Sequence, residues 1–424
     1  MGLFNKIFLG TIVSFYFFPI GFTFLPPSIN TKMLLAIFGC LVFLLDNFKL
    51  SELKFSYNLL VSTIIAGFFS VICLYAADFN HTNDYSYATY IISFFVWLGG
   101  AYAVAWFFRF FYGEFSFRQL TFYLIAVCVT QCFLSLAIDN FHAFKMIVDS
   151  VFLQGQEFLG KVDRLYGIGA SLDNAGVRFS IVLIMAANLL IHDKAVKANT
   201  KQYFLILLSF FIIGIIGNMI SRTTVIGAGI GFVYLIFYSD IFNKIIYYHS
   251  FKRALIFLIV VVFIVGFAVY IYNTSLEYRL SIRFAFEGFF NWYEVGVWRT
   301  SSTDKLNAEM WIWPTTREEW LIGTGIFGNF VYSTDIGYCR FILYCGLIGF
   351  STFASLFIYN SFAFMIKVPQ YRVLFLILGA LSFIIWLKVA TDIFFVFALF
   401  YCIDSFSTSE DAQQELEVLD ENSI

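Results

Sequence analysis

Charged side chains are scarce in this sequence of 424 residues. Asp, Glu, Lys and Arg together make up 13% of it, whereas 60% of the residues are hydrophobic. A soluble globular domain typically has roughly 45–50% apolar and about 25% charged residues. A water-soluble core of this length does not need so much apolar surface, which excludes a soluble protein. The composition predicts an all-α, polytopic integral membrane protein.

Residues that usually bind metals are also few and dispersed. The chain has four histidines, no Asp-x-Asp sequence, and seven cysteines that all lie in or at the edges of apolar stretches. Cys128 and Cys132 share a helix face, but neither a histidine nor a third cysteine lies close by, so packing is the favoured interpretation. No disulfide framework, metal centre or organic cofactor is expected.

The first apolar stretch, at about 7–25, has no small-residue site for a signal peptidase and is followed by Pro26 and Pro27. We therefore expect an uncleaved first helix. The hydroxyl residue that N-myristoylation requires at position six is absent as well, because Lys6 occupies that position.

Twelve apolar stretches have the length of helices. They lie at about residues 7–25, 33–45, 57–77, 88–108, 120–138, 179–191, 203–220, 223–238, 254–272, 338–359, 372–387 and 389–403. We expect about twelve transmembrane helices in a single domain over 1–403, with long periplasmic loops at about 139–178 and 273–337. The segment 404–424 has seven acidic and no basic residues, and is expected to be a disordered cytoplasmic tail.

The distribution of basic residues predicts the orientation. With the N-terminus inside, the inner loops contain 13 lysines and arginines, and the short outer loops contain three. Short basic loops resist translocation, so both termini are expected in the cytoplasm. The two long outer loops follow the fifth and the ninth apolar stretches, so they do not fall at equivalent positions of two six-span halves. This argues against a transporter built from repeats.

Both long loops contain segments suited to a membrane surface. Four apolar residues of the first loop fall on one helical face: Phe141, Phe144, Ile147 and Val151. A helix lying in the membrane surface is one interpretation. The second loop has five tryptophans: Trp292, Trp298, Trp311, Trp313 and Trp320. Anchoring at the membrane interface is favoured for them, and stacking on sugar rings is the alternative.

Two glycine-rich segments have structural interpretations. "GTGIFG" (323–328) matches the dinucleotide pattern, which is meaningful only between a strand and a helix. Here it falls in a predicted outer loop and indicates a turn that returns the loop to the membrane. "GAGIG" (227–231) lies within an apolar stretch and indicates close packing of helices.

Arginines in the predicted outer half are candidates for binding an anion. Arg222 interrupts a nearly continuous apolar region, and Arg164 and Arg178 bracket the segment before the sixth stretch. A guanidinium at such depth is costly unless it faces a cavity or binds an anion. Its planar fork suits the oxygens of a diphosphate. The alternatives are a side chain that reaches the interface at a helix end, or an ion pair with Asp173.

Four segments, taken in order, resemble landmarks of the O-antigen polymerase and O-antigen ligase superfamily. They are "RLYGIGASLDNAG", "SRTTVIGAGIGF", "LIGTGIFGN" and "STDIGYCRFILYCGLIGF", and the resemblance covers roughly residues 160–350. Ligases of this superfamily typically have a histidine just before the span that follows the large loop. Asp335 occupies that place here, which resembles the polymerases. Arg317 and Gly328 also fit a spacing described for the polymerases, an arginine and a glycine separated by ten residues.

The resemblance implies polymerisation of a glycan at the periplasmic face of the bacterial inner membrane. A growing chain on undecaprenyl diphosphate would be transferred to a hydroxyl of a newly delivered, lipid-linked repeat unit. No metal is needed for this chemistry, because the diphosphate is already a good leaving group. The implied partners are the lipid-linked oligosaccharides, membrane lipid, a chain-length regulator and a flippase, with no nucleic acid.

The same resemblance suggests roles for individual residues. Arg164 and Arg222 would stabilise the charge on the leaving diphosphate, with Arg178 and Arg340 as further diphosphate contacts. Asp335 would accept the proton of the attacking hydroxyl, and the alternative is that it caps the helix that follows. Arg340, one turn later, would pair with Asp335 or contact an anion. Further candidate contacts from the loop region are Arg299, Arg317 and Tyr338.

Two other functions remain open at this point. A ligase that joins the glycan to a lipid core would share the scaffold. A flippase or another transporter of lipid-linked oligosaccharides would also need many spans, although the two long loops argue against it.

Overall fold

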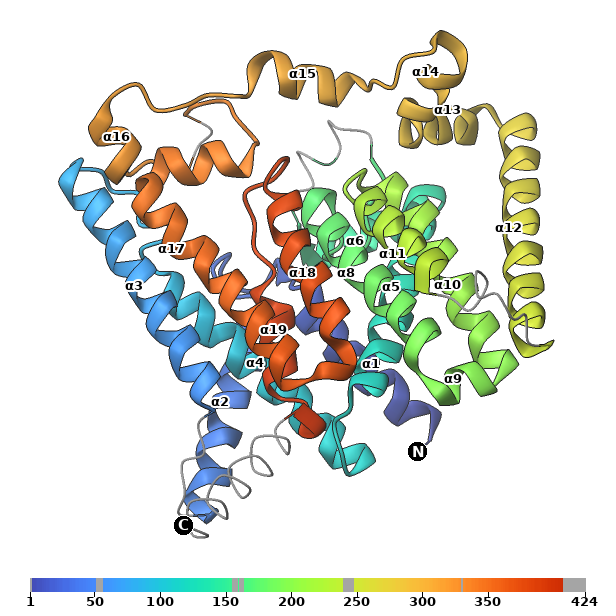
Figure 1. Ribbon diagram of the computed structural model, residues 1–424, viewed down its shortest axis with the longest axis horizontal. Helices are drawn as coiled ribbons and strands as arrows, with labels where there is room; N and C mark the ends of the chain where they lie inside the picture. Colours follow the sequence, from blue (N-terminus) through green and yellow to red (C-terminus); the bar gives the residue numbers. More distant parts are fainter. Residues whose placement is uncertain are drawn as a thin grey trace, which may run out of the picture. The chain divides into compact units, whose positions relative to one another are not determined.

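Helices form at all of the apolar stretches, as the ribbon of Figure 1 shows for the computed structural model. The structure describes residues 2–50, 56–154, 159, 164–238, 248–328 and 331–406. Each of the twelve stretches overlaps a helix: α1 (Leu3–Phe17), α2 (Thr31–Leu50), α3 (Tyr57–Phe79), α4 (Tyr90–Tyr112), α5 (Phe117–Asn140), α8 (Leu172–His192), α10 (Thr200–Ile220), α11 (Thr224–Tyr238), α12 (Tyr248–Thr274), α17 (Gly337–Lys367), α18 (Arg372–Ile385) and α19 (Phe394–Tyr401).

Within the described residues, seven helices are long and apolar enough to cross a membrane. They are α2, α3, α4, α5, α8, α10 and α17. This confirms the prediction of an all-α fold suited to a multi-pass membrane protein. The prediction of about twelve spans stays a prediction. The prediction of a single domain followed by an acidic tail stays a prediction, because 407–424 lies outside the described residues.

Some predicted boundaries were wrong. The first stretch was expected to be helical to about residue 25, but α1 ends at Phe17 because Pro19 disfavours helical geometry at the residue before it. The chain continues into β1 (Gly21–Phe22), which pairs antiparallel with β2 (Phe152–Leu153). The sixth stretch was expected to begin at 179, but α8 already begins at Leu172.

Short helices occupy the long loops. They are α6 (His142–Val151), α13 (Leu276–Ala285), α14 (Glu287–Val295), α15 (Ser301–Glu309) and α16 (Arg317–Ile322); two further short helices, α9 (Lys194–Ala198) and η2 (Pro369–Tyr371), join neighbouring long ones. The helix expected in the first loop is confirmed as α6. It buries Val148 and leaves Met146 and Ile147 exposed. That it lies in a membrane surface stays a prediction.

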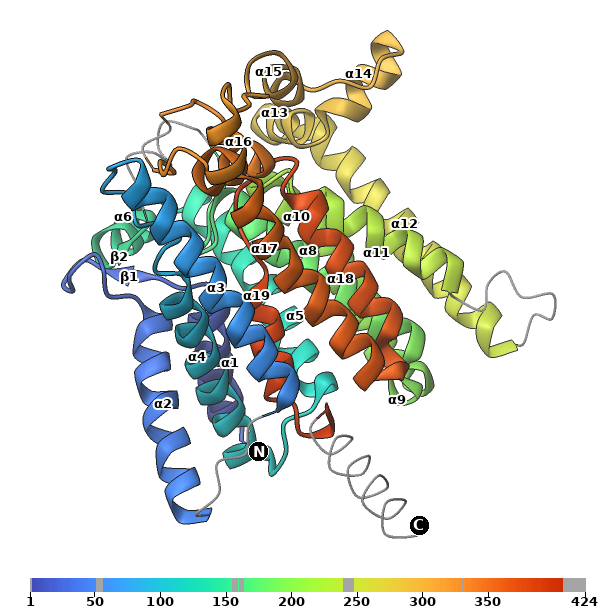
Figure 2. The same ribbon diagram turned by 60° about the vertical axis from the view of Figure 1, so that its left-hand side comes forward.

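The chain forms two compact units, each with its own helices. Unit 1 consists of residues 1–5, 32–117 and 301–424, and unit 2 consists of 6–31 and 118–300. In unit 1, α17 packs against α3, α16 and α18 (Figure 2). Its core is aromatic: Trp386 is fully buried, and the ring of Phe353 stacks between the rings of Trp386 and Phe69, with ring centroids 5.5 and 4.6 Å away.

In unit 2, the buried helix α8 packs against α10 and α11. The approach of α11 to α8 depends on glycine. A Cβ atom added at Gly227 would lie 2.1 Å from Cα of Ser180, and one at Gly231 would lie 2.8 Å from the ring of Phe210. The close packing predicted for "GAGIG" is therefore confirmed at these two positions. Gly229, between them, faces open space.

We predict opposite outcomes for two alanine substitutions on α11. Gly227→Ala forces α11 away from α8 and should lower the free energy of unfolding by about 1–3 kcal/mol, the usual cost of overpacking. Gly229→Ala should be neutral or stabilise the helix by about 0.5–1 kcal/mol, because alanine is the better helix former. Thermal unfolding of the detergent-solubilised variants measures both. Equal melting temperatures for the two variants would show that the contact is not tight.

Candidate functional site

Two of the predicted arginines meet on one aromatic ring of unit 2. The guanidinium carbon of Arg222 lies 3.9 Å from the ring centroid of Phe284, and that of Arg164 lies 5.4 Å from the same centroid. Arg222 also forms an ion pair with Glu287, at 2.8 Å between Nη2 and Oε2. We refer to Arg164, Arg222, Phe284 and Glu287 as the arginine pair site. Two cations therefore converge on one ring, and the role predicted for them stays a prediction.

A short turn between α10 and α11 fixes the position of Arg222. Asp173, in the first turn of α8, accepts hydrogen bonds from the hydroxyl groups of Ser221 (3.1 Å) and Thr223 (2.5 Å). The carbonyl of Thr223 accepts another from Ser180 Oγ at 3.0 Å. Both neighbours of Arg222 are therefore bound to α8, so its side chain leaves the turn in a defined direction.

The other half of the site is fixed to α10. Asn218 is buried and donates a hydrogen bond to the carbonyl of Ala285, at 2.8 Å. Ala285 ends α13 and directly follows Phe284, and Glu287 begins α14. This single amide therefore aligns the aromatic ring and the carboxylate with the turn that carries Arg222. Neither Phe284 nor Glu287 was predicted from sequence, since both come from a loop without a recognisable motif.

The arginine pair site brings two guanidinium groups together in a largely buried environment. The side chain of Arg222 is only 11% exposed. Burial lowers the pKa of Arg222, the charge of Glu287 raises it, and the charge of Arg164 lowers it. Glu287 offsets one of the two guanidinium charges. The Nε atom of Arg164 is buried and has no hydrogen-bond partner among the described residues. Because Phe284 itself is 41% exposed, the site borders accessible surface.

Arg178 does not belong to this site in the way the sequence predicted. It lies inside α8 rather than in the loop before it. Its Nε donates to the carbonyl of Phe17, and its Nη1 donates to the carbonyl of Asn174 at 2.9 Å. Phe17 is the last residue of α1, where unpaired carbonyls and the helix dipole favour a cation. These bonds give Arg178 a structural role at the end of α1.

The neighbourhood of Asp335 lies in unit 1, at the start of α17. Asp335 is exposed, so it is not the desolvated carboxylate that was expected. It is not the cap of α17 either: Ile336 occupies that position, no side chain caps the helix there, and the N–H of Ile336 donates to the hydroxyl of Thr334 at 3.2 Å. The capping interpretation is therefore wrong, because Ile336 rather than Asp335 is the N-cap residue and the N–H of Tyr338, two residues further on, donates to the carbonyl of Trp386 at 3.1 Å.

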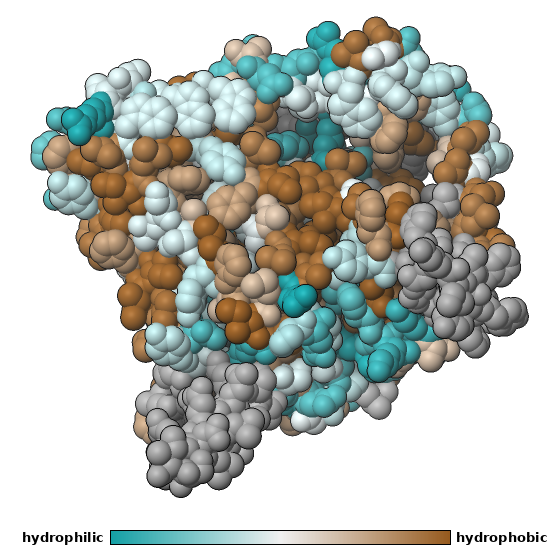
Figure 3. Space-filling view, in the orientation of Figure 1, coloured by the Kyte–Doolittle hydropathy of each residue, from teal (hydrophilic) through white to brown (hydrophobic). Residues whose placement is uncertain are grey.

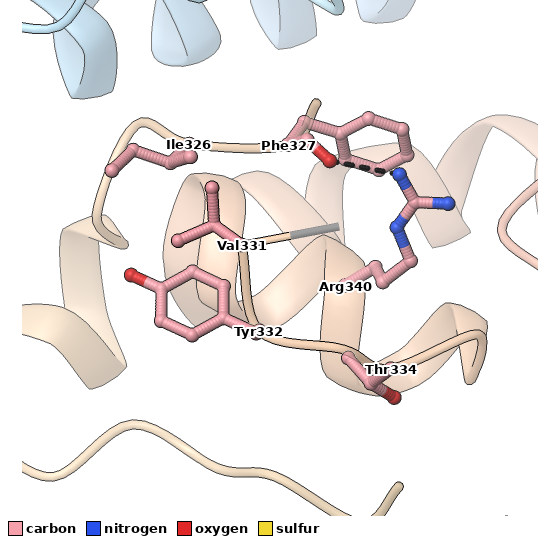
Figure 4. Close-up of a pocket in the computed structure, with 6 residues that line it drawn as sticks. All are labelled: Ile326, Phe327, Val331, Tyr332, Thr334 and Arg340. Atoms are coloured by element: carbon pink, nitrogen blue, oxygen red, sulfur yellow. Dashed lines mark hydrogen bonds between the residues drawn. The ribbon is translucent and has the colours of Figure 1, made fainter. Parts of the chain in front are cut away.

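Arg340 lines a small, shallow pocket next to this turn (Figure 4). Its Nη2 donates to the carbonyl of Phe327 at 2.8 Å, and its guanidinium carbon lies 4.0 Å from the centroid of the Phe327 ring. The charges of Asp335 and Asp84 both act on Arg340. The pocket, which we call the Arg340 pocket, is lined by Ile326, Phe327, Val331, Tyr332, Thr334 and Arg340.

The "GTGIFG" segment builds one wall of that pocket. Gly325 has a positive φ of 67°, and the carboxylate of Asp84 accepts hydrogen bonds from the N–H groups of Phe327 (2.7 Å) and Gly328 (2.6 Å). No strand precedes the segment, so the dinucleotide interpretation fails and the predicted turn is confirmed. Sequence reasoning missed Asp84, which lies in the connection between α3 and α4, far away along the chain.

Of the three remaining candidate contacts, one is hydrogen-bonded to a neighbouring helix and two are exposed. Tyr338 lies in the first turn of α17, and its hydroxyl donates to the carbonyl of Phe383 at 2.9 Å, which is a packing role. Arg317 begins α16 and is exposed, and Arg299 is exposed as well. Among the described residues, no three His, Cys, Asp or Glu side chains form a group that would hold a metal ion.

Comparisons with protein-family models, curated proteins and solved structures gave no match for this chain. The functional argument therefore depends on the arginine pair site and the Arg340 pocket themselves.

We predict that Asp84 stabilises the turn in a pH-dependent way. Burial raises the pKa of Asp84, but hydrogen bonds from Gly328, Ser86 and Phe327 together lower it below its usual value. A carboxyl group with a lowered pKa stabilises the folded state above its unfolded pKa of about 3.9, and that contribution is lost as the pH falls through the folded value.

Asp84→Asn should therefore increase protease cleavage within 323–336 at pH 7.5, with a loss of about 1–2 kcal/mol of local stability. The difference from wild type should shrink as the pH approaches 3. Asp78→Asn, at an exposed position of α3, is the matched control. Equal cleavage of all three proteins at pH 7.5 would contradict the role of Asp84.

Proposed function

We propose that this protein is a membrane glycosyltransferase of the O-antigen polymerase type, which transfers a growing glycan from undecaprenyl diphosphate to a lipid-linked repeat unit. The observation that carries the proposal is the convergence of Arg164 and Arg222 on Phe284, beside the carboxylate of Glu287. The resemblance of residues 160–350 to the polymerase and ligase superfamily supports the same function.

The chemistry of the arginine pair site suits a diphosphate. Two guanidinium groups present planar sets of N–H donors, which match phosphate oxygens better than the point charge of a lysine does. A partly buried position strengthens this attraction, because fewer water molecules compete with it. Burial of Arg222 and the nearby charge of Arg164 both disfavour the unliganded arrangement. A bound dianion would relieve that repulsion.

The proposed membrane arrangement has about twelve spans and both termini in the cytoplasm. It is supported by the helices at all twelve apolar stretches, and by the excess of basic residues in the short loops assigned to the inside. In this arrangement the protein resides in the bacterial inner membrane, and Arg164 and Arg222 open toward the periplasm. A lipid-linked substrate delivered to that face would meet them there.

The proposed reaction forms one glycosidic bond and breaks the bond between the growing chain and the lipid diphosphate. A hydroxyl oxygen of the acceptor repeat unit attacks the anomeric carbon of the growing chain, and the bond from that carbon to the diphosphate breaks. The leaving undecaprenyl diphosphate takes the electron pair, and Arg164 and Arg222 stabilise its charge. The hydroxyl proton passes to a base, for which Asp335 is the candidate. Because Asp335 is exposed, its basicity would increase only when a bound substrate excludes water.

A deletion strain distinguishes this function from its two rivals. Loss of a polymerase leaves surface glycan that is only one repeat unit long. Loss of a ligase leaves long polymer on the carrier lipid and a bare lipid core. Loss of a flippase leaves single units on the cytoplasmic face. We expect the first of these, and either of the other patterns would overturn the proposal.

We predict that Arg164→Ala and Arg222→Ala each reduce chain extension by about 100-fold or more, the usual cost of removing a donor to a developing negative charge. Arg164→Lys and Arg222→Lys should retain part of the activity, because charge remains and the planar fork is lost. Purified variants with a defined lipid-linked repeat unit provide the measurement.

Arg118→Ala is the matched control for this series. Arg118 forms an ion pair with Asp193; the side chain of Arg118 is 51% exposed and that of Asp193 is 8% exposed. Arg118→Ala therefore tests whether breaking an arginine ion pair is by itself enough to reduce chain extension. All variants must reach the membrane in similar amounts. Polymer of normal length and rate from Arg164→Ala or Arg222→Ala would refute the role of that residue.

We predict separately that Asp335→Asn abolishes chain extension while leaving the melting temperature unchanged, because the exposed side chain does not cap α17. Asp335→Glu should retain some activity. If Asp335→Asn extends chains at the wild-type rate, another group accepts the proton.

A further inference from the structure

Three tryptophans of unit 1 form a ladder on the surface of the second long loop. The ring centroids of Trp311 and Trp313 are 5.7 Å apart. Those of Trp313 and Trp320 are 5.8 Å apart, with their planes only 15° from parallel. Trp311 is 41% exposed and Trp313 is 38% exposed. We call these three residues the tryptophan ladder; neither the arginine pair site nor the Arg340 pocket includes them.

The backbone beneath the ladder is fixed to α17. Residues 311–315 form no helix or strand, and burial alternates along them, so that Ile312 points inward while Trp311 and Trp313 are exposed. Met310 and Ile312 pack with Ile336. The hydroxyl of Thr334 donates to the carbonyl of Met310 at 2.6 Å. The two exposed indoles are therefore held in place by their buried neighbours.

The third indole is fixed independently. Trp320 belongs to α16, whose start is stabilised by a capping box between Thr316 and Glu319. The end of α16 touches the backbone of α17 so closely that a Cβ atom on Gly346 would lie 2.2 Å from the carbonyl oxygen of Leu321. All three rings are thus presented by rigid backbone, which reduces the entropy lost when a ligand binds.

The surroundings of the ladder favour a polar ligand over a lipid surface. Over residues 304–320 there are four acidic residues, Asp304, Glu309, Glu318 and Glu319, and two basic ones, Lys305 and Arg317. Segments that bind an anionic membrane surface carry an excess of lysine and arginine instead. In Figure 3 the surface over α15 and α16 is white to teal, whereas that over α3 is mostly brown.

Residues next to the ladder contact two residues of the Arg340 pocket. Tyr332 and Thr334 line that pocket, and both contact the segment that precedes the ladder: Tyr332 packs in the same cluster as Met310 and Ile312, and Thr334 is bonded to Met310. The backbone of the ladder and the Arg340 pocket are thus attached to the same turn at the start of α17. Sugar rings suit the aromatic faces of the ladder, because the C–H groups on one side of a pyranose pack against an indole while its hydroxyls stay in water.

We propose that the tryptophan ladder is a binding surface for the carbohydrate chain of the substrate, separate from the groups proposed to act on the bond that reacts. This inference rests on the proposed glycosyltransferase function and adds a second site to it. A chain held at the ladder stays with the enzyme between additions, so the ladder determines polymer length rather than the rate of a single coupling.

The test compares Trp313→Ala with Trp292→Ala in the full-length protein. Trp292 is 56% exposed and belongs to unit 2, so it provides a control for the loss of one exposed indole. Oligosaccharides of two to five repeat units, prepared from the surface polysaccharide of the host cells, are titrated against each protein. We expect Trp313→Ala to bind about tenfold more weakly than wild type, a difference of about 1.4 kcal/mol, because the contact between the indole and a sugar ring is lost. Trp313→Phe should recover most of the affinity.

The same variants are assayed for polymer length and for the first coupling step. We expect Trp313→Ala to shorten the most abundant chain length by at least half and to leave the first coupling unchanged. Unchanged binding and unchanged chain length in Trp313→Ala would overturn the inference.

A third measurement separates a glycan from a membrane. In nanodiscs that contain lipids with brominated chains, tryptophans at the bilayer are quenched. If Trp313→Ala removes quenched fluorescence without changing oligosaccharide binding, the ladder is a membrane anchor and the inference fails. If wild type binds the oligosaccharides through Trp313 but makes no polymer, the glycosyltransferase function fails instead, while the ladder remains a glycan site.

Discussion

Placing two guanidinium groups beside one phenyl ring is the constraint on which the rest of unit 2 depends. Arg222 is nearly buried and forms an ion pair with Glu287, while Arg164 adds a second cation. Such an arrangement is costly unless the backbone around it is rigid and an anion occupies it. The hydrogen bonds of Asp173 and Asn218, and the glycine contact between α8 and α11, supply that rigidity.

Unit 1 follows the same pattern around the start of α17. The turn at 323–328 closes onto Asp84, Arg340 stacks on a ring in that turn, and the segment with the tryptophan ladder is attached to the same first turns. In both units, loop segments that would otherwise be mobile are fixed to a buried helix by a few polar side chains. The candidate functional residues lie on these fixed segments, which is where binding groups are held most accurately.

How far the sequence predicts this structure depends on the physical signal that each feature leaves. Apolar stretches predicted all the long helices, because a helix is the form in which a lipid-facing chain satisfies its own hydrogen bonds. Arg222 was singled out because a cation that interrupts an apolar region is unusual, and Arg164 because it lies just before an apolar stretch; that the two meet on one ring was not predicted. Phe284 and Asp84 were missed, since their roles depend on contacts between loops that leave no periodic pattern. The capping role of Asp335 was wrong because the helix begins one residue later than expected, with Ile336 as its N-cap residue.

The most direct test of the central claim is a structure of the full-length protein determined with undecaprenyl diphosphate. The account predicts the diphosphate within hydrogen-bond distance of both Arg164 and Arg222, beside the ring of Phe284. A diphosphate bound away from both arginines, with the ion pair of Arg222 and Glu287 undisturbed, would contradict it.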